Sequence, residues 1–284
     1  GFFGLKQRII TALILAPLVI LGIFELSLPT FIFSLAVISL LGFWEWTQFV
    51  ESKSRYLALI PTVVVSAASF AFIPFDAFSL NDLSSAHYAI LTIGSIWWVI
   101  ASGMAVTYPK SMPAWKDSSF LRHAFGVLTL LPFFWSVVIL RANGIDVDPY
   151  HGAKLVMFVC LLVWAADSGA YFSGKSFGKR KMAPAVSPNK TIEGLIGGII
   201  TAVIVAWIFA DLFDIQFTSP LHMIIITLVT VVISVLGDLV ESMFKRVSGV
   251  KDSSNLIPGH GGILDRIDSL TAAFPVFALL YLAF

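Results

Sequence analysis

The chain has 284 residues, of which 58% are hydrophobic and 12% charged, and its mean hydropathy is +0.91. Soluble globular proteins are about 25% charged, so this chain has too few charges to cover a water-exposed surface of its own size. The composition therefore excludes an ordinary soluble enzyme, a disordered protein and a nucleic-acid-binding protein with a basic face. The net charge of +1 predicts no partner, and the single Cys160 matches neither a disulfide nor a metal-binding pattern.

Long apolar runs dominate the chain. A helix needs about 20 apolar residues to cross the hydrocarbon core of a bilayer, and about nine runs have that length. They cover residues 9–26, 29–46, 57–75, 87–107, 122–140, 153–172, 193–213, 221–240 and 268–284. Helices of this length satisfy their own backbone hydrogen bonds in lipid. We therefore predict an all-α polytopic integral membrane protein with about nine transmembrane helices.

The basic residues indicate the orientation of these helices. With nine spans, all but two of the 18 Lys and Arg residues fall on the side of the N-terminus, and only Arg141 and Lys154 fall on the other. Positively charged residues accumulate in cytoplasmic loops. The N-terminus is therefore predicted to be cytoplasmic and the C-terminus to lie outside.

Polar sequence is concentrated in the second half of the chain. This contrast divides the chain into an N-terminal region of about five spans, 1–150, and a C-terminal catalytic region of about four spans, 151–284. The C-terminal region carries two predicted cytoplasmic loops, 173–192 and 241–267, which are rich in basic residues and glycines.

Acidic residues lie in the spans that lead to these loops. Asp167 and Asp238 each lie near the cytoplasmic end of a span, and Asp268 lies at the mouth of the last span. A lone acid within a span costs about 2.5–3.5 kcal/mol on insertion scales. Several acids at one depth therefore need a cation or basic residues to balance their charge.

The spacing of these residues suggests a site. One helix face is shared by residues at i, i+3, i+4 and i+7, namely Asp238, Glu241, Ser242 and Lys245. Asp265 and Asp268 are also three residues apart, and acidic pairs that flank one loop can hold Mg²⁺ together with substrate phosphates. Gly259, Gly261 and Gly262 let backbone amides approach phosphate oxygens closely. Acids, bases and glycines together indicate phosphoryl or nucleotidyl transfer at the membrane face.

The stretch from Ser242 to Asp268 reads S-M-F-K-R-x4-K-D-x-S-x2-I-P-x-H-G-G-I-x-D-R-I-D. It resembles the signature of the phosphatidate cytidylyltransferases, also called CDP-diacylglycerol synthases, and segments 164–171, 187–194 and 237–242 are similar to that family too. The resemblance implies that CTP and phosphatidate react to give CDP-diacylglycerol and pyrophosphate, with Mg²⁺ as the cofactor and a second cation as an option. It implies CTP and membrane lipid as partners, without nucleic acid, and leaves a homodimer open. A bacterial inner membrane is implied, with the active site facing the cytoplasm.

Residue chemistry and the resemblance together suggest roles. The expected metal ligands are Asp238 and Asp265, followed by Asp268 and Asp167. The expected catalytic residues are Asp238, Lys245, Arg246, Lys251, Asp265 and Arg266. The expected substrate-binding residues are Lys175, Ser187, Asn189, Lys190, Glu193, Ser242, His260, Gly261 and Gly262. Glu45, between two tryptophans, is interpreted as an interfacial carboxylate, with support of a site as the alternative.

An ion-coupled membrane transporter is the main alternative, because intramembrane acids also mark ion pathways. Acids of secondary transporters tend to lie near the bilayer midplane, between repeated halves of the chain. Here they gather toward one face and the sequence has no evident repeat, which favours the enzyme. A CDP-alcohol phosphotransferase is a further alternative, but its spaced D-G…A-R…G…D…D pattern is absent.

Overall fold

The structure is a computed structural model, and it describes residues 2–50, 53–250, 252–254, 256–257 and 261–284. The long helices are α1 (Phe2–Glu25), α2 (Leu28–Trp46), α3 (Arg55–Phe72), α5 (Ser85–Val106), α6 (Ser119–Ala142), α7 (His151–Phe177), α8 (Ile192–Leu212), α9 (Pro220–Ser248) and α10 (Ile263–Ala283). The short elements are η1 (Thr47–Phe49), α4 (Ala77–Asn81), η2 (Met112–Ala114), β1 (Lys181–Ala183) and β2 (Ser187–Thr191).

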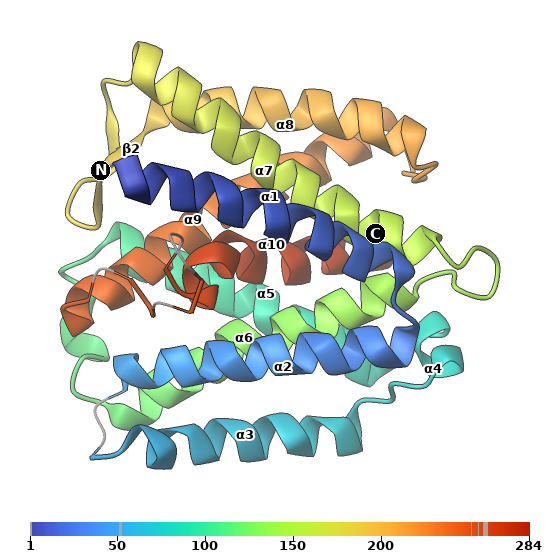
Figure 1. Cartoon of the computed structure of the whole chain (residues 1–284), viewed down its shortest axis with the longest axis horizontal. Helices are drawn as coiled ribbons and strands as arrows, with labels where there is room; N and C mark the ends of the chain where they lie inside the picture. The colour runs from blue at the N-terminus through green and yellow to red at the C-terminus, as the bar shows by residue number, and fades with distance from the viewer. Residues whose placement is uncertain (1, 51–52, 251, 255, 258–260) are drawn as a thin grey trace.

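The predicted fold class, an all-α polytopic membrane protein, is confirmed. Within the described ranges, eight helices are long and apolar enough to cross a membrane, and they form one bundle (Figure 1). The eight do not include α10, which covers the predicted span 268–284 and carries Asp265, Arg266 and Asp268 near its start. The count of nine spans and the sidedness of the termini stay predictions.

The apolar surface of the bundle is turned outward. In α1 only 6% of the residues in the apolar window are buried, whereas in the central helix α6 the share is 78%. Exposed Leu, Ile and Phe side chains on α1, α2, α3 and α8 would be unfavourable in water but match a hydrocarbon solvent. The outer helices therefore face lipid, and α6 packs in the core together with α7, α9 and α10.

The predicted loop 241–267 begins before the end of α9, so its first residues are helical in the structure. Helix α9 continues through Ser248, so Glu241, Ser242 and Lys245 lie on the helix rather than in a loop. The helix ends where Gly249 adopts the left-handed conformation, with φ of +73°, and its N–H bonds back to the carbonyl of Arg246. A glycine at this position costs no Cβ strain. The helix extends through this stretch because Leu239, Met243 and Phe244 continue its buried apolar face, while the polar residues occupy the other face.

The predicted loop 173–192 is likewise structured. Its first part completes α7, which ends at Phe177, and a β-hairpin of β1 and β2 follows. The two strands are antiparallel, with Lys181 opposite Thr191 and Ala183 opposite Ser187. Thr191 then caps α8 by accepting a hydrogen bond from the amide of Gly194. The hairpin returns the chain into the membrane directly after the site residues.

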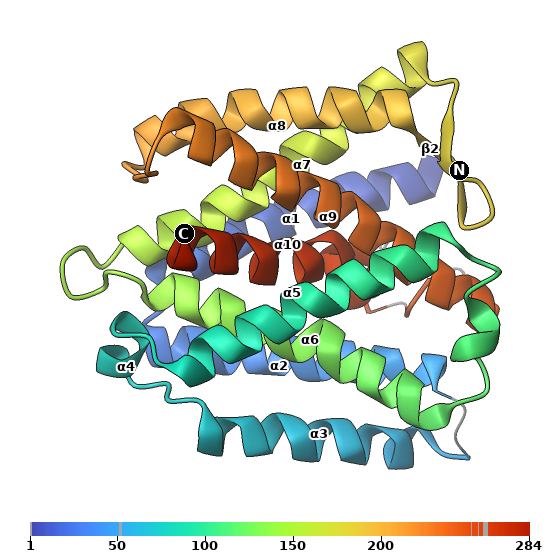
Figure 2. The same cartoon turned by 180° about the vertical axis from the view of Figure 1, so that it is seen from behind.

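Helices α9 and α10 approach each other closely. An added Cβ on Gly237 would lie 2.8 Å from the Cβ of Ala272, so only glycine permits this spacing. Both views place α10 near the centre of the bundle, where it contacts α5, α6, α7 and α9 (Figures 1 and 2). Because Asp238 follows Gly237 directly, the close contact sets the acid of α9 beside the start of α10.

Candidate active site

The polar residues of the C-terminal region meet at one end of the bundle. The last turns of α9, the first turns of α10 and the β1–β2 hairpin all lie at this end, at the left of Figure 1. The hairpin and α9 are joined here by a hydrogen bond from the Arg246 Nε to the carbonyl of Val186. Arg246 thus anchors the hairpin over α9, the helix that carries Asp238 and Glu241.

Three carboxylates form an acidic cluster, defined as Asp238, Glu241 and Asp268. One oxygen of each lies within 4.8 Å of one oxygen of the other two. Asp238 and Glu241 are neighbours on one face of α9, whereas Asp268 comes from α10. Carboxylate oxygens at this spacing are the ligand set that hard divalent cations prefer.

Glu241 is the most deeply placed member of the acidic cluster. It is only 6% exposed, and among the described residues neither of its carboxylate oxygens has a hydrogen-bond partner. The Lys245 Nζ lies 3.9 Å from the Glu241 Oε1, which is an ion pair but too long for a hydrogen bond. Buried carboxylates are costly unless they are paired or coordinate a metal. The residues present therefore fit a bound cation.

Two lysines flank the acidic cluster. The Lys190 Nζ, from β2, lies 2.5 Å from the Asp238 Oδ2. Burial opposes the charged form of Lys190, but the attraction of Asp238 outweighs it and raises the pKa of Lys190. The Lys245 Nζ lies 3.1 Å from the Asp265 Oδ1 and so bridges Glu241 and Asp265. The cluster thus has a positive group on the hairpin side and another on the loop side.

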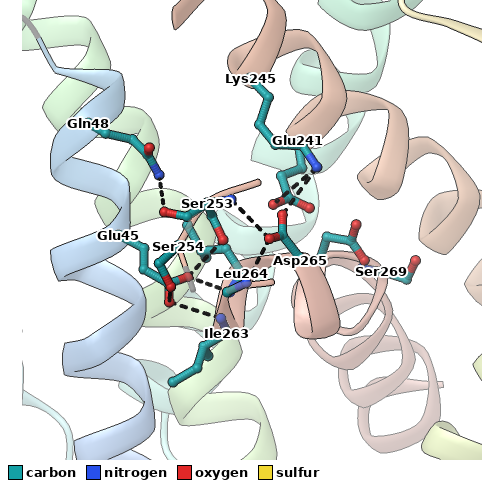
Figure 3. Close-up of polar contacts among 12 residues, drawn as sticks. Glu45, Gln48, Glu241, Lys245, Ser253, Ser254, Ile263, Leu264, Asp265 and Ser269 are labelled. Atoms are coloured by element: carbon teal, nitrogen blue, oxygen red, sulfur yellow. Dashed lines mark hydrogen bonds and ion pairs between the residues drawn. The ribbon is translucent and has the colours of Figure 1, made fainter. Parts of the chain in front are cut away.

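Asp265 makes a different set of contacts from the acidic cluster. Its Oδ2 accepts hydrogen bonds from the backbone N–H of Ser253, at 2.9 Å, and of Gly262, at 2.8 Å (Figure 3). Its other oxygen binds Lys245. Asp265 therefore holds both sides of the loop between α9 and α10. Its predicted role as a metal ligand stays a prediction, and Glu241 is the acid that the structure adds beside Asp238 and Asp268.

Asp167, on α7, lies near enough to Asp238 and Lys190 to interact with their charges, but it does not belong to the acidic cluster. Asp167 is exposed and is not one of the three acids whose oxygens converge. Lys175 is exposed near the end of the same helix, with its Nζ 5.9 Å from the centroid of the Tyr171 ring. Their roles as metal ligand and substrate-binding residue stay predictions.

Glu193 organises the entry of the hairpin. It accepts hydrogen bonds from the backbone N–H of Lys179, at 2.6 Å, and of Arg180, at 2.7 Å. The Arg180 side chain adds an ion pair of 3.0 Å. Ser187 and Asn189 lie on β2, with Asn189 exposed. These contacts give Glu193 a local role in holding the hairpin on which Lys190 is carried.

The remaining predicted residues are placed as follows. Arg266 is exposed in the first turn of α10, and Ser242 is half-buried on α9. Gly261 has φ of +80°, and an added Cβ there would lie 2.7 Å from the Asp265 Oδ2, so both its conformation and its space require glycine. Gly262 is buried directly before α10. Lys251 and His260 lie outside the described residues.

The interpretation of Glu45 as an interfacial carboxylate is wrong. Glu45 is fully buried near the end of α2, and its side chain accepts four hydrogen bonds from the loop and the start of α10 (Figure 3). The sequence did carry a signal for this burial: a lone acid within an apolar helix is costly unless its carboxylate has hydrogen-bond or ionic partners. Nothing in its neighbourhood along the chain identifies partners that lie about two hundred residues away.

The chain is similar to known proteins over nearly its whole length. A family model described as the cytidylyltransferase family matches residues 6–284. A protein of Haemophilus influenzae named phosphatidate cytidylyltransferase is 45% identical over 283 residues, which cover 98% of each chain. Proteins of the same name from Pseudomonas aeruginosa and Bacillus subtilis are 41% and 32% identical. These matches cover 97% and 99% of this chain, and 96% and 98% of those relatives.

Proposed function

Because this chain belongs to the cytidylyltransferase family, we propose that it catalyses the reaction of CTP with phosphatidate to give CDP-diacylglycerol and pyrophosphate. The observation that carries the proposal is the acidic cluster, set between Lys190 and Lys245 at one end of a bundle of apolar helices. A lipid substrate and a charged nucleotide can both reach such a place. The enzyme is an integral membrane protein, and we place it in a bacterial inner membrane with this end toward the cytoplasm.

The reaction needs little covalent help from the protein. A phosphomonoester has a second pKa of about 6, so the phosphatidate headgroup is largely dianionic at neutral pH and is itself the nucleophile. Its oxygen forms a bond to the α-phosphorus of CTP while the bond from that phosphorus to the bridging oxygen breaks, and pyrophosphate leaves with that electron pair. The barrier comes from bringing two anions together, and positioning and charge neutralisation lower it.

Asp238, Glu241 and Asp268 would hold the divalent cation, which we propose is Mg²⁺. A cation bound there would neutralise phosphate charge and align the triphosphate for in-line attack. The protein's contribution is to fix three oxygens from two helices before substrate arrives. Asp167 and Asp265, near the same end, are proposed to support this site rather than to complete it.

The basic side chains bind the anionic reactants. Lys190 is carried on the hairpin and Lys245 on α9, so they reach the acidic cluster from two sides. Arg266 is exposed in the first turn of α10, where it can bind the leaving pyrophosphate. Lys175, Arg246, Lys251 and His260 are proposed to add to the phosphate-binding surface, with Ser187, Asn189, Ser242 and the glycines shaping it.

An ion-coupled transporter is disfavoured. The three converging acids lie in the second half of α9 and in the first third of α10, so they are displaced toward one end of the bundle. The relatives that match nearly the whole chain are named as enzymes. A transporter would also carry its ion across proteoliposomes in the absence of CTP.

The decisive experiment measures the transfer of radiolabelled cytidylyl groups from CTP to extracted lipid by the purified chain. Label should enter lipid only when phosphatidate and a divalent cation are both present, and pyrophosphate should form in equal amount. Lipid labelling without phosphatidate, or none with all components and folded protein, would contradict the proposal. Ion flux without CTP would favour the transporter.

A further inference from the structure

The first turn of α10 receives its capping group from another helix. The residue at its N-cap position is Gly262, which has no side chain to accept the N–H groups that a helix leaves unpaired at its start. The Glu45 carboxylate accepts two of them, from Ile263 at 2.9 Å and from Leu264 at 2.8 Å (Figure 3). A carboxylate at a helix N-terminus is also stabilised by the helix dipole.

The same carboxylate holds the other side of the α9–α10 loop. The Ser253 and Ser254 hydroxyls donate to its two oxygens at 2.9 and 2.8 Å. Gln48, one turn further along the chain from Glu45, donates from its Nε2 to the carbonyl of Ser253 at 2.6 Å. Two segments of the loop that are separated in sequence are therefore tied to the end of α2 and to one another.

The fit around Glu45 is close. An added Cβ on Gly262 would lie 2.7 Å from the Glu45 Oε1 and 2.1 Å from the Ser253 Oγ. Glycine is thus needed for the chain to pass this carboxylate, and the missing N-cap side chain is the consequence. The Glu45 carboxylate of α2 thus takes the place of a capping side chain at position 262, and this couples the N-terminal region of the chain to the start of α10.

We infer that Glu45 is a positioning residue for the proposed reaction: its carboxylate sets the first turn of α10, and through it the placement of Asp265 and Asp268. Asp265 belongs to that turn and bonds Lys245, while Asp268 follows three residues later and joins the acidic cluster. A shift at the start of α10 would therefore displace one acid of the cluster and the partner of its neighbouring lysine. The inference rests on the proposed function for its catalytic consequence.

The test compares Glu45→Gln and Glu45→Asp with Glu25→Gln, an exposed carboxylate at the end of α1. Glutamine keeps the shape but replaces one acceptor oxygen by a donor, so at least one of the four hydrogen bonds is lost. We expect Glu45→Gln to lower kcat by about 10–100-fold and to raise the Mg²⁺ concentration for half-maximal rate by a similar factor. The KM for CTP should change less, since none of the four groups that donate to Glu45 belongs to a proposed CTP-binding residue. Glu45→Asp should recover part of the loss, and Glu25→Gln should match wild type.

Hydrogen–deuterium exchange gives a readout that does not require activity. Peptides covering 261–270 should exchange faster in Glu45→Gln than in wild type, whereas Glu25→Gln should leave them unchanged. Wild-type exchange, kcat and Mg²⁺ requirement in folded Glu45→Gln would overturn the inference, as would an activity loss that only follows the unfolded fraction. If wild type itself transfers no cytidylyl group, the proposed function fails, and the exchange data still decide the positioning role.

A second variant guards against misfolding of Glu45→Gln. Replacing both Ser253 and Ser254 by alanine removes two donors to Glu45 and keeps its bonds to Ile263 and Leu264. We expect a smaller loss of kcat and a smaller increase in the Mg²⁺ requirement. Wild-type values for both in this double variant, when Glu45→Gln cannot be purified folded, would overturn the inference.

Discussion

Lys190 and Asp238 form an ion pair, with the Lys190 Nζ 2.5 Å from the Asp238 Oδ2, and this pair joins the β-hairpin to the acidic cluster. Lys190 is the basic residue that the hairpin brings to the acids, and its raised pKa keeps it charged at neutral pH. It balances part of the negative charge of the cluster, and we propose that it also binds a phosphate of the substrate.

Replacing Lys190 by alanine should lower kcat/KM for CTP by about 10²–10³-fold, the usual effect of removing one group that stabilises developing charge. Steady-state kinetics in detergent micelles would measure it. Lys154→Ala is the matched control, because Lys154 forms an ion pair with Asp148 between α6 and α7, away from the cluster. Equal kinetics for the two variants would show that Lys190 contributes no more than an ordinary ion pair.

Replacing Glu241 by glutamine should separate activity from stability. Activity should fall by about 10²-fold or more, because one ligand of the proposed cation loses its charge. The thermal midpoint without divalent cations should stay equal or rise, since a buried amide costs less than a buried carboxylate whose oxygens accept no hydrogen bond from any described residue. Differential scanning fluorimetry and the cytidylyl-transfer assay would measure the two. A lower midpoint together with full activity would contradict the placement of a cation at Glu241.

Removal of divalent cations should lower both the activity and the thermal stability of the wild-type protein. Treatment with EDTA should abolish turnover and lower the thermal midpoint, because Lys190 and Lys245 then compensate the repulsion among the three acids only in part. Added Mg²⁺ should restore both, and the increase in midpoint should be much smaller in Asp268→Asn. If the thermal midpoint of the wild-type protein changes neither with EDTA nor with Mg²⁺, no cation binds the cluster.

Gly237→Ala should push α9 away from α10, because the new Cβ would lie 2.8 Å from that of Ala272. Overpacking of this kind costs about 1–3 kcal/mol of stability, and kcat should fall as Asp238 moves from Asp268. The double variant Gly237→Ala with Ala272→Gly should recover both. Gly103→Ala on α5 is the control, since a Cβ there meets nothing within 4 Å. Thermal unfolding and kinetics would measure the effect, and a silent Gly237→Ala would refute the spacing argument.

Local sequence patterns were sufficient to predict several features of this protein. The low charge and the long apolar runs predicted the membrane helices, because hydrocarbon thickness sets a length that can be counted along the chain. The i, i+3 and i+7 spacing of Asp238, Glu241 and Lys245 predicted one shared face, since helical periodicity is a local property. The motif from Ser242 to Asp268 predicted the family, which the comparisons confirm.

The sequence by itself therefore determined that the protein lies in a membrane, where most of its long helices run and which kind of chemistry it supports, because each depends on neighbours along the chain. Only the tertiary structure decided which carboxylates converge. The contact at Gly237 sets Asp268, of α10, beside Asp238 and Glu241, while Asp265 turns toward the loop and Lys245. Glu45 reached its partners in the same way, across 208 residues to Ser253. Periodicity along the sequence shows which face of a helix is polar, but the packing of helices decides which part of another helix lies opposite that face.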